Sequence, residues 1–151
     1  PRLEGGGVGG CQSRLIREDL ARRESRLHEG GESQRLKVRE WLYWEAERIG
    51  LNLAHAVSAR RFGGYLEPVI KWYGHRVTED LRKLDAVLRE HPFLVGETVT
   101  IADIACAAWF PFARELGMDV DGFAAVNAWW KRLEALPGFA TPQEVFAETT
   151  A

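Results

Sequence analysis

The sequence has few of the features that mark several broad protein classes. Its 20 lysines and arginines are outnumbered by 22 aspartates and glutamates, which gives a formal net charge of −2. This charge argues against a general nucleic-acid-binding protein, because such proteins carry a basic excess. No apolar run reaches the roughly eighteen residues that a membrane-spanning helix needs, and the glycine-rich start lacks the apolar segment of a signal peptide. We therefore expect no nucleic-acid partner and no membrane partner.

Cysteine and histidine are also scarce. Cys11 and Cys106 are isolated and lack the spacing of a metal site or of a redox pair. Cys106 lies in an apolar stretch, where a thiol usually serves as a small core side chain. His55 and His75 have no companions at ligand spacing, so we expect no metal site. Two isolated thiols suit a reducing compartment, and we expect a cytoplasmic protein.

The chain does contain enough apolar sequence for a sizeable core. Hydrophobic residues make up 46% of the 151 residues, and six residues are tryptophan. Apolar residues recur at a three-four spacing over residues 32–61, which predicts one long helix with a bend at Gly50. A second long helix should begin near Pro68, which suits a first helical turn, and end at His91, before another proline. We expect these two helices to pack antiparallel.

The sequence around Asp103 is typical of the start of a buried helix. Thr100 can act as the N-cap, and Asp103 at the third helical position can reach back to the amide of Thr100. Together they predict a capping box, and Val99 with Ile104 predicts a hydrophobic staple around it. The sequence that follows is apolar on all sides, as expected for a helix at the centre of a domain. This helix should extend over residues 101–115.

This helix start resembles that of a known family. A loop reading Phe-Leu-x-Gly, followed by Thr-x-Ala-Asp at the start of a buried helix, is typical of the C-terminal domain of cytosolic glutathione transferases. The matching residues here are Phe93, Leu94, Gly96, Thr100, Ala102 and Asp103. The later segment from Trp129 to Phe139 is also similar to the family. The resemblance implies an all-α fold class, with residues 32–151 forming a glutathione transferase C-terminal-like helical bundle.

The first residues resemble the end of the thioredoxin-like domain of the same family. There, a cis-proline opens a strand, a tight turn and a second strand follow, and a helix begins with Gln-Ser or Glu-Ser. The matching residues are Pro1, Leu3, Glu4, Gly7, Val8, Gln12 and Ser13. The resemblance implies that residues 1–31 are a truncated thioredoxin-like remnant, a possible hairpin plus one helix, followed by a linker. The alternative is a flexible, glycine-rich leader over residues 1–10.

The resemblance also assigns a ligand to the start of this first helix. In the family, the Gln-Ser pair holds the γ-glutamyl carboxylate and amine of glutathione, and this role falls on Gln12 and Ser13. A carboxylate is well placed at the free amides of a helix N-terminus. The alternative is that Ser13 is an ordinary N-cap. The chain departs from the family at Arg17 and Asp19, where apolar residues are usual.

A hydrophobic substrate pocket is a further expectation from the resemblance. It places Tyr43 and Trp44 on one wall, and Trp109 and Phe110 beside a kink that we expect at Pro111. The alternative is that these aromatic side chains belong to the core or lie at its edge. The long helix that carries Tyr43 and Trp44 would also form part of a homodimer interface.

The family's thiol-activating Tyr, Ser or Cys has no counterpart in this sequence, so we predict no catalytic residue. The sequence begins with Pro rather than Met, and we expect a fragment that is inactive alone. It would supply the substrate pocket and dimer face for conjugating glutathione, the co-substrate, to a small apolar electrophile. The alternative is a non-catalytic helical module for protein interaction or dimerisation.

Overall fold

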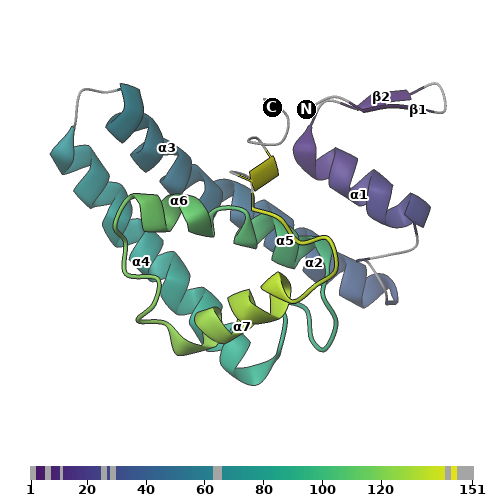
Figure 1. Cartoon of the computed structure of the whole chain (residues 1–151). Helices are drawn as coiled ribbons and strands as arrows, with labels where there is room; N and C mark the ends of the chain where they lie inside the picture. Colours follow the sequence, from purple (N-terminus) through teal and green to yellow (C-terminus); the bar gives the residue numbers. More distant parts are fainter. Residues whose placement is uncertain are drawn as a thin grey trace.

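The structure is a computed structural model, and it describes residues 3–5, 8–10, 12–24, 27, 30–62, 66–141 and 144–145. Over these residues the chain forms a short hairpin followed by helices (Figure 1). The elements are β1 Leu3–Gly5, β2 Val8–Gly10, α1 Ser13–Glu24, α2 Glu32–Glu47, α3 Ile49–Phe62, α4 Glu67–Glu90, α5 Ile101–Ala107, α6 Phe110–Glu115 and α7 Ala124–Glu134. The expected helical bundle is confirmed.

The hairpin and α1 form the start of the described chain. Strands β1 and β2 pair antiparallel, with Leu3 opposite Gly10 and Gly5 opposite Val8. Helix α1 follows and lies at one edge of the bundle, beside α2 and α5 (Figure 1). Pro1, for which the resemblance implies a cis peptide bond, lies outside the described residues. The hairpin and the helix therefore occur in the predicted order.

The prediction of one long helix over residues 32–61 is wrong, because two helices meet at Arg48. Arg48 has φ −120° and ψ −97°, well outside helical geometry. Its Nε donates to Oδ1 of Asp80 on α4 at 2.9 Å, which draws the chain towards α4 at this point. Gly50 follows in the first turn of α3. A Cβ there would lie 2.7 Å from Oε1 of Glu45 and 2.8 Å from Nε1 of Trp109, so glycine permits this close packing.

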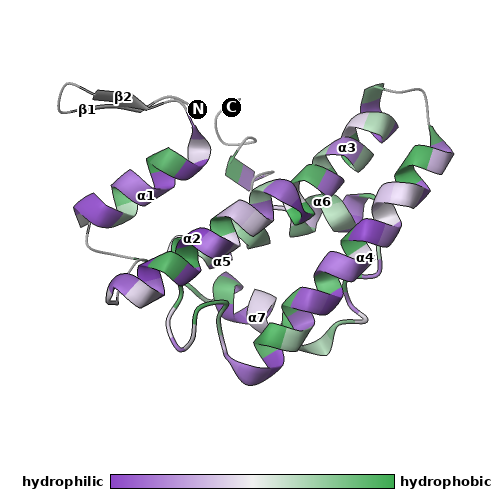
Figure 2. Ribbon diagram, turned by 180° about the vertical axis from the view of Figure 1, so that it is seen from behind, coloured by the Kyte–Doolittle hydropathy of each residue, from purple (hydrophilic) through white to green (hydrophobic). Residues whose placement is uncertain are grey.

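Helix α3, the second part of the segment predicted as one long helix, packs antiparallel to α4 (Figure 1). Pro68 stands in the first turn of α4, and the helix ends at a C-cap on His91 in extended conformation. The inner face of α4 is apolar and buried at Ile70, Val77, Leu81, Leu84 and Leu88. Figure 2 shows hydrophilic and hydrophobic residues alternating along the helices, as expected when each helix buries one face.

The buried helix predicted over residues 101–115 is divided into α5 and α6. Helix α5 ends at Ala107, and α6 begins at Phe110 with Pro111 in its first turn. Proline has no amide hydrogen, and its ring collides with the carbonyl four residues earlier, so the helix stops instead of kinking. Gly117 closes α6 with φ +72°. Helix α5 lies at the centre of the bundle, and most of its residues are buried.

The apolar core is continuous across the bundle and includes the ring of Trp129, which is among the largest fully buried side chains. Within the described ranges, no helix is both long enough and apolar enough to cross a membrane.

Candidate functional site

The start of α5 is held by a buried carboxylate. Asp103 has no exposed surface. Its Oδ2 accepts hydrogen bonds from the amide and the hydroxyl of Thr100 at 2.8 and 3.0 Å. Its Oδ1 accepts from the amide of Leu94 and from Nε1 of Trp129, both at 2.9 Å. The Thr100 hydroxyl in turn accepts from the amide of Ala102 at 3.3 Å. The capping box therefore also fastens the preceding loop and α7 to α5.

This environment shifts the pKa of Asp103. Burial raises the pKa of Asp103 above its usual range, although the hydrogen bonds from Leu94, Thr100 and Trp129 oppose this shift. Every polar contact of the carboxyl group is to the protein itself. Thr100 and Asp103 thus fix the fold around the site and offer no free atom for chemistry.

The N-terminus of α1 presents the two residues that the resemblance assigns to glutathione. The carbonyl of Gln12 accepts the first helical hydrogen bond, from Ile16 at 2.9 Å, so Gln12 occupies the N-cap position. Ser13 is the first residue of the helix and is half-buried. Among the described residues, neither side chain has a hydrogen-bond partner. A hydroxyl, a carboxamide and free helix amides therefore lie at one end of α1.

One residue after Ser13, α1 is joined to the rest of the bundle through Glu45 of α2. The Glu45 side chain is 3% exposed, and its Oε2 accepts from Nε of Arg14 at 3.2 Å. Its Oε1 accepts from Nε1 of Trp109 at 2.6 Å. Trp109 is the N-cap residue of α6, between α5 and α6. A single carboxylate therefore connects three parts of the bundle: α1, α2 and the junction of α5 with α6.

The two charged residues of α1 that depart from the family pattern, Arg17 and Asp19, differ in burial and in their partners. Asp19 pairs with Arg22 at 2.8 Å and with Arg23 at 2.6 Å on the surface of α1, and these bonds lower its pKa. Arg17 is half-buried and has no hydrogen-bond partner in the described part of the chain. Burial lowers the pKa of Arg17, an effect that the negative charge of Glu45 opposes.

Cys106 lies near these charges, in surroundings that disfavour the thiolate. It is completely buried on α5. Burial, together with the negative charge of Glu45, raises the pKa of Cys106 well above its usual range. Because the thiolate is the nucleophile of cysteine chemistry, a thiol held protonated does not take part in it. Cys106 acts as a small core side chain, as its apolar sequence context predicts.

The four aromatic pocket candidates lie in different surroundings. Tyr43 is 68% exposed on α2, and Phe110 is 1% exposed. Phe110 packs against Trp129, with ring centroids 5.4 Å apart. Trp44 and Trp109 are half-buried, and the ring of Trp44 lies 5.1 Å from that of Trp41. The structure thus places Phe110 in the core and leaves the other three in reach of solvent.

Cavities are found elsewhere in the described part, and two of them border α5. The larger, about 490 Å³, lies between α1 and α2 and is lined by Glu18, Arg22, Glu32, Arg35, Leu36, Val38, Arg39 and Ile101. The other, about 330 Å³, lies beside α5 and is lined by Ile104, Ala107, Ala108, Trp130, Gly138, Phe139, Ala140, Thr141 and Val145. The four aromatic candidates line neither cavity.

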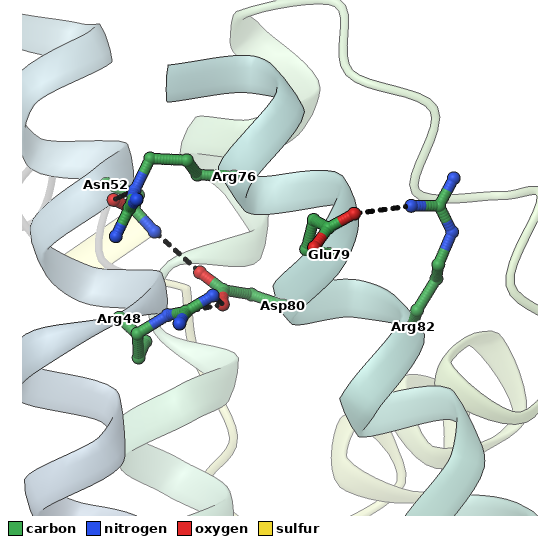
Figure 3. Close-up of polar contacts among 6 residues, drawn as sticks. All are labelled: Arg48, Asn52, Arg76, Glu79, Asp80 and Arg82. Carbon is green, nitrogen blue, oxygen red and sulfur yellow. Dashed lines mark hydrogen bonds and ion pairs between the residues drawn. The ribbon is translucent and has the colours of Figure 1, made fainter. Parts of the chain in front are cut away.

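A buried polar cluster between α3 and α4 was not predicted from the sequence. Oδ2 of Asp80 accepts from Nδ2 of Asn52 at 2.7 Å, and Oδ1 pairs with Arg48 at 2.7 Å (Figure 3). Nε of Arg76 donates to Oδ1 of Asn52 at 3.0 Å. Burial raises the pKa of Asp80, against the effect of these partners. The available signal was the position of Asp80 one residue before Leu81, within the apolar stripe of α4.

A second aspartate of α4 caps another helix. Asp85 is buried, and its Oδ1 accepts from the amides of Ala125 and Val126 in the first turn of α7 at 2.9 and 3.4 Å. Phe123, the N-cap residue of α7, cannot supply this cap itself. Among the residues the structure describes, no group of three or more His, Cys, Asp or Glu side chains is arranged to hold a metal ion.

Comparison with known proteins shows that both the sequence and the fold of this chain are similar to those of glutathione transferases. The model of the glutathione S-transferase C-terminal domain matches residues 67–137. A glutathione S-transferase from Xanthobacter autotrophicus superposes with a TM-score of 0.83 at 27% identity, over 97% of this chain and 72% of that one. Residues 67–137 therefore belong to the glutathione S-transferase C-terminal domain family. The fold expected from the Thr100–Asp103 segment is therefore the fold of its relatives.

The similar proteins include an oxidoreductase and a family member with bound glutathione. The disulfide-bond oxidoreductase YfcG of Escherichia coli is 27% identical over 108 residues, which cover 69% of this chain and 49% of the relative. A family member from Pseudomonas fluorescens, solved with two glutathione molecules bound, has a TM-score of 0.76 at 23% identity, over 86% of this chain and 61% of that one. The chain thus spans about half the length of this curated relative.

Proposed function

We propose that this chain binds glutathione at the N-terminus of α1. The observation that carries the proposal is that the Gln12 and Ser13 side chains lack partners among the described residues, at a helix end where amides are free. A helix N-terminus attracts a carboxylate through its unpaired amides and its dipole. The Ser13 hydroxyl can donate to the same carboxylate, and the Gln12 carboxamide oxygen can accept from the glutamyl amine.

We propose that a small apolar electrophile binds against the aromatic side chains near α2. Trp109 is the strongest candidate for the wall of this pocket, because it is half-buried and its indole is fixed by Glu45. Trp44 and Tyr43 would extend the wall along α2, and Phe110 would support it from the core. The reaction would then be conjugation of glutathione to the electrophile, with thiol activation by a residue outside these 151 residues. On this view the 151 residues alone are inactive.

The proposal includes a cytoplasmic homodimer. Large apolar side chains are exposed on α2 and α3, the segment that the resemblance places at the dimer interface, namely Leu36 and Leu51. Burying such side chains against a second copy would remove apolar surface from water. Sedimentation velocity tests this: the wild type should sediment as a dimer, and Leu51→Glu should shift it to monomer. A wild type that is monomeric at micromolar concentrations would refute the dimer.

Isothermal titration calorimetry with reduced glutathione tests the binding site. Ser13→Ala should weaken glutathione binding about tenfold, the order expected for a lost hydrogen bond to a charged group. Ser33→Ala is the matched control, since Ser33 also lies in the first turn of a helix and is exposed. A wild type that does not bind glutathione, or equal losses in the two variants, would contradict the assignment.

A second candidate function is a non-catalytic helical interaction or dimerisation module. Arg17 favours it, because a half-buried arginine occupies a position where the family usually has an apolar residue. A chain that dimerises but does not bind glutathione would favour this alternative over the transferase proposal.

A further inference from the structure

Glu45 is a buried carboxylate with bonds to two parts of the site that have no direct bond to each other. One oxygen accepts from Arg14 at 3.2 Å, next to the glutathione-binding Ser13 of the proposal. The other accepts from the indole of Trp109 at 2.6 Å. These partners lie 31 and 64 residues away in sequence, so the arrangement is a product of the fold.

The packing leaves Glu45 little freedom to change its bonds. Its side chain is 3% exposed, so water is not available to replace either partner. Gly50 lies close to the Glu45 carboxylate, since a Cβ atom at this position would lie 2.7 Å from Oε1. The nearby cations are Arg14 and Arg17, and Arg17 has no hydrogen bond of its own among the described residues. A displacement of Arg14 would remove a hydrogen bond from Oε2 of the same carboxylate whose Oε1 is bonded to Trp109.

We propose that Glu45 is a positioning residue that couples the glutathione end of the site to its aromatic wall. This inference rests on the proposed function, which assigns Ser13 and Trp109 to one site. An anion at the N-terminus of α1 lies next to Arg14 and competes with Glu45 for its guanidinium. As that bond weakens, Oε1 of Glu45 holds the Trp109 indole more strongly. By linkage, a ligand that moves Trp109 changes glutathione affinity by the same factor.

The first test needs no ligand. The indole ¹⁵N–¹H resonance of Trp109, assigned with Trp109→Phe, is compared between the wild type and Arg14→Ala. We expect this resonance to shift while that of Trp129, bonded to Asp103, stays in place. Arg39→Ala is the matched control, because Arg39 pairs with Glu18 at 3.1 Å across the same α1–α2 seam without contacting Glu45.

The outcomes of this test are distinct. A Trp109 shift in Arg14→Ala that exceeds the shift in Arg39→Ala supports the route through Glu45. Equal shifts in the two variants would show only that α1 has loosened, and an unmoved Trp109 would show that Glu45 does not transmit the change. Either of the last two results overturns the inference.

The second test adds reduced glutathione and Glu45→Gln. Glutamine keeps the volume but replaces one of the two carboxylate oxygens with an NH2 group, so either Arg14 or Trp109 faces a donor in place of its acceptor. Glutathione should shift the Trp109 indole in the wild type and not in Glu45→Gln, and its affinity should fall about fivefold or more in the variant. If the wild type does not bind glutathione, the proposed function fails, and the ligand-free comparison still decides the inference. If it binds and Glu45→Gln behaves identically, the inference fails and the proposed function stands.

Discussion

Replacing Asp103 with alanine should be among the most damaging single changes in the described chain. The substitution removes the acceptor of four hydrogen bonds at a site with no exposed surface. Loss of the cap costs about 0.5–2 kcal/mol. The Leu94 amide and the Trp129 indole would also be left without an acceptor, at about 1–3 kcal/mol each. Relief from burying the carboxylate offsets part of this, and we expect a net loss of about 3 kcal/mol.

Urea denaturation followed by circular dichroism at 222 nm measures this loss directly. A domain of this size has about 5–15 kcal/mol of stability, so the midpoint should fall by a large fraction. Asp119→Ala is the control, because Asp119 also accepts from a backbone amide, that of Gly122 at 2.8 Å, but on the surface. Its cost should stay below about 1 kcal/mol. Equal midpoints for Asp103→Ala and Asp119→Ala would refute the reasoning.

Three further predictions concern the stability of variants at other buried positions. Asp85→Ala should destabilise by about 1–2 kcal/mol through loss of the α7 cap, and an unchanged urea midpoint would contradict this role. Gly50→Ala should lower the melting temperature despite the better helix propensity of alanine, because its Cβ would collide with Glu45; a higher melting temperature would show that the packing adjusts. Burial raises the pKa of Asp80 in the folded state. The stabilisation that comes from protonating Asp80 is therefore complete below its unfolded pKa of about 3.9 and is lost as pH rises through its folded pKa. The stability of Asp80→Asn relative to the wild type should therefore increase between pH 4 and 7, and a decrease would contradict the direction of the shift.

Features set by near neighbours in sequence were predictable. The capping box joins two residues that are three apart, Thr100 and Asp103, and their types at this spacing predict it. Pro68 and the His91-Pro92 pair mark the ends of α4 because proline restricts its own backbone and that of the residue before it. The same logic located the interruption before Pro111, where α5 ends at Ala107 and α6 begins at Phe110.

Features set by distant partners were not predictable. The sequence predicts a bend at Gly50, but the helix breaks at Arg48, whose side chain is bonded to Asp80, 32 residues later. Glu45 falls within the apolar stripe of α2, four residues after Trp41, but its partners lie on other helices and could not be named from the local sequence. Asp85, like Asp80, falls within the apolar stripe of α4, and this position indicates a buried side chain without indicating its partner. The ligand roles of Gln12 and Ser13, and the pocket roles of Tyr43, Trp44 and Trp109, remain predictions.

The sequence separations at Asp103 also carry a consequence for the order of folding. Its bonds reach 3, 9 and 26 residues along the chain, to Thr100, Leu94 and Trp129. Closing a longer loop costs more chain entropy, so the contacts should form in that order. The local turn would then be complete before α7 arrives and would act as a template for its docking. Refolding should accordingly slow in Asp103→Ala, whereas Trp129→Phe should chiefly accelerate unfolding.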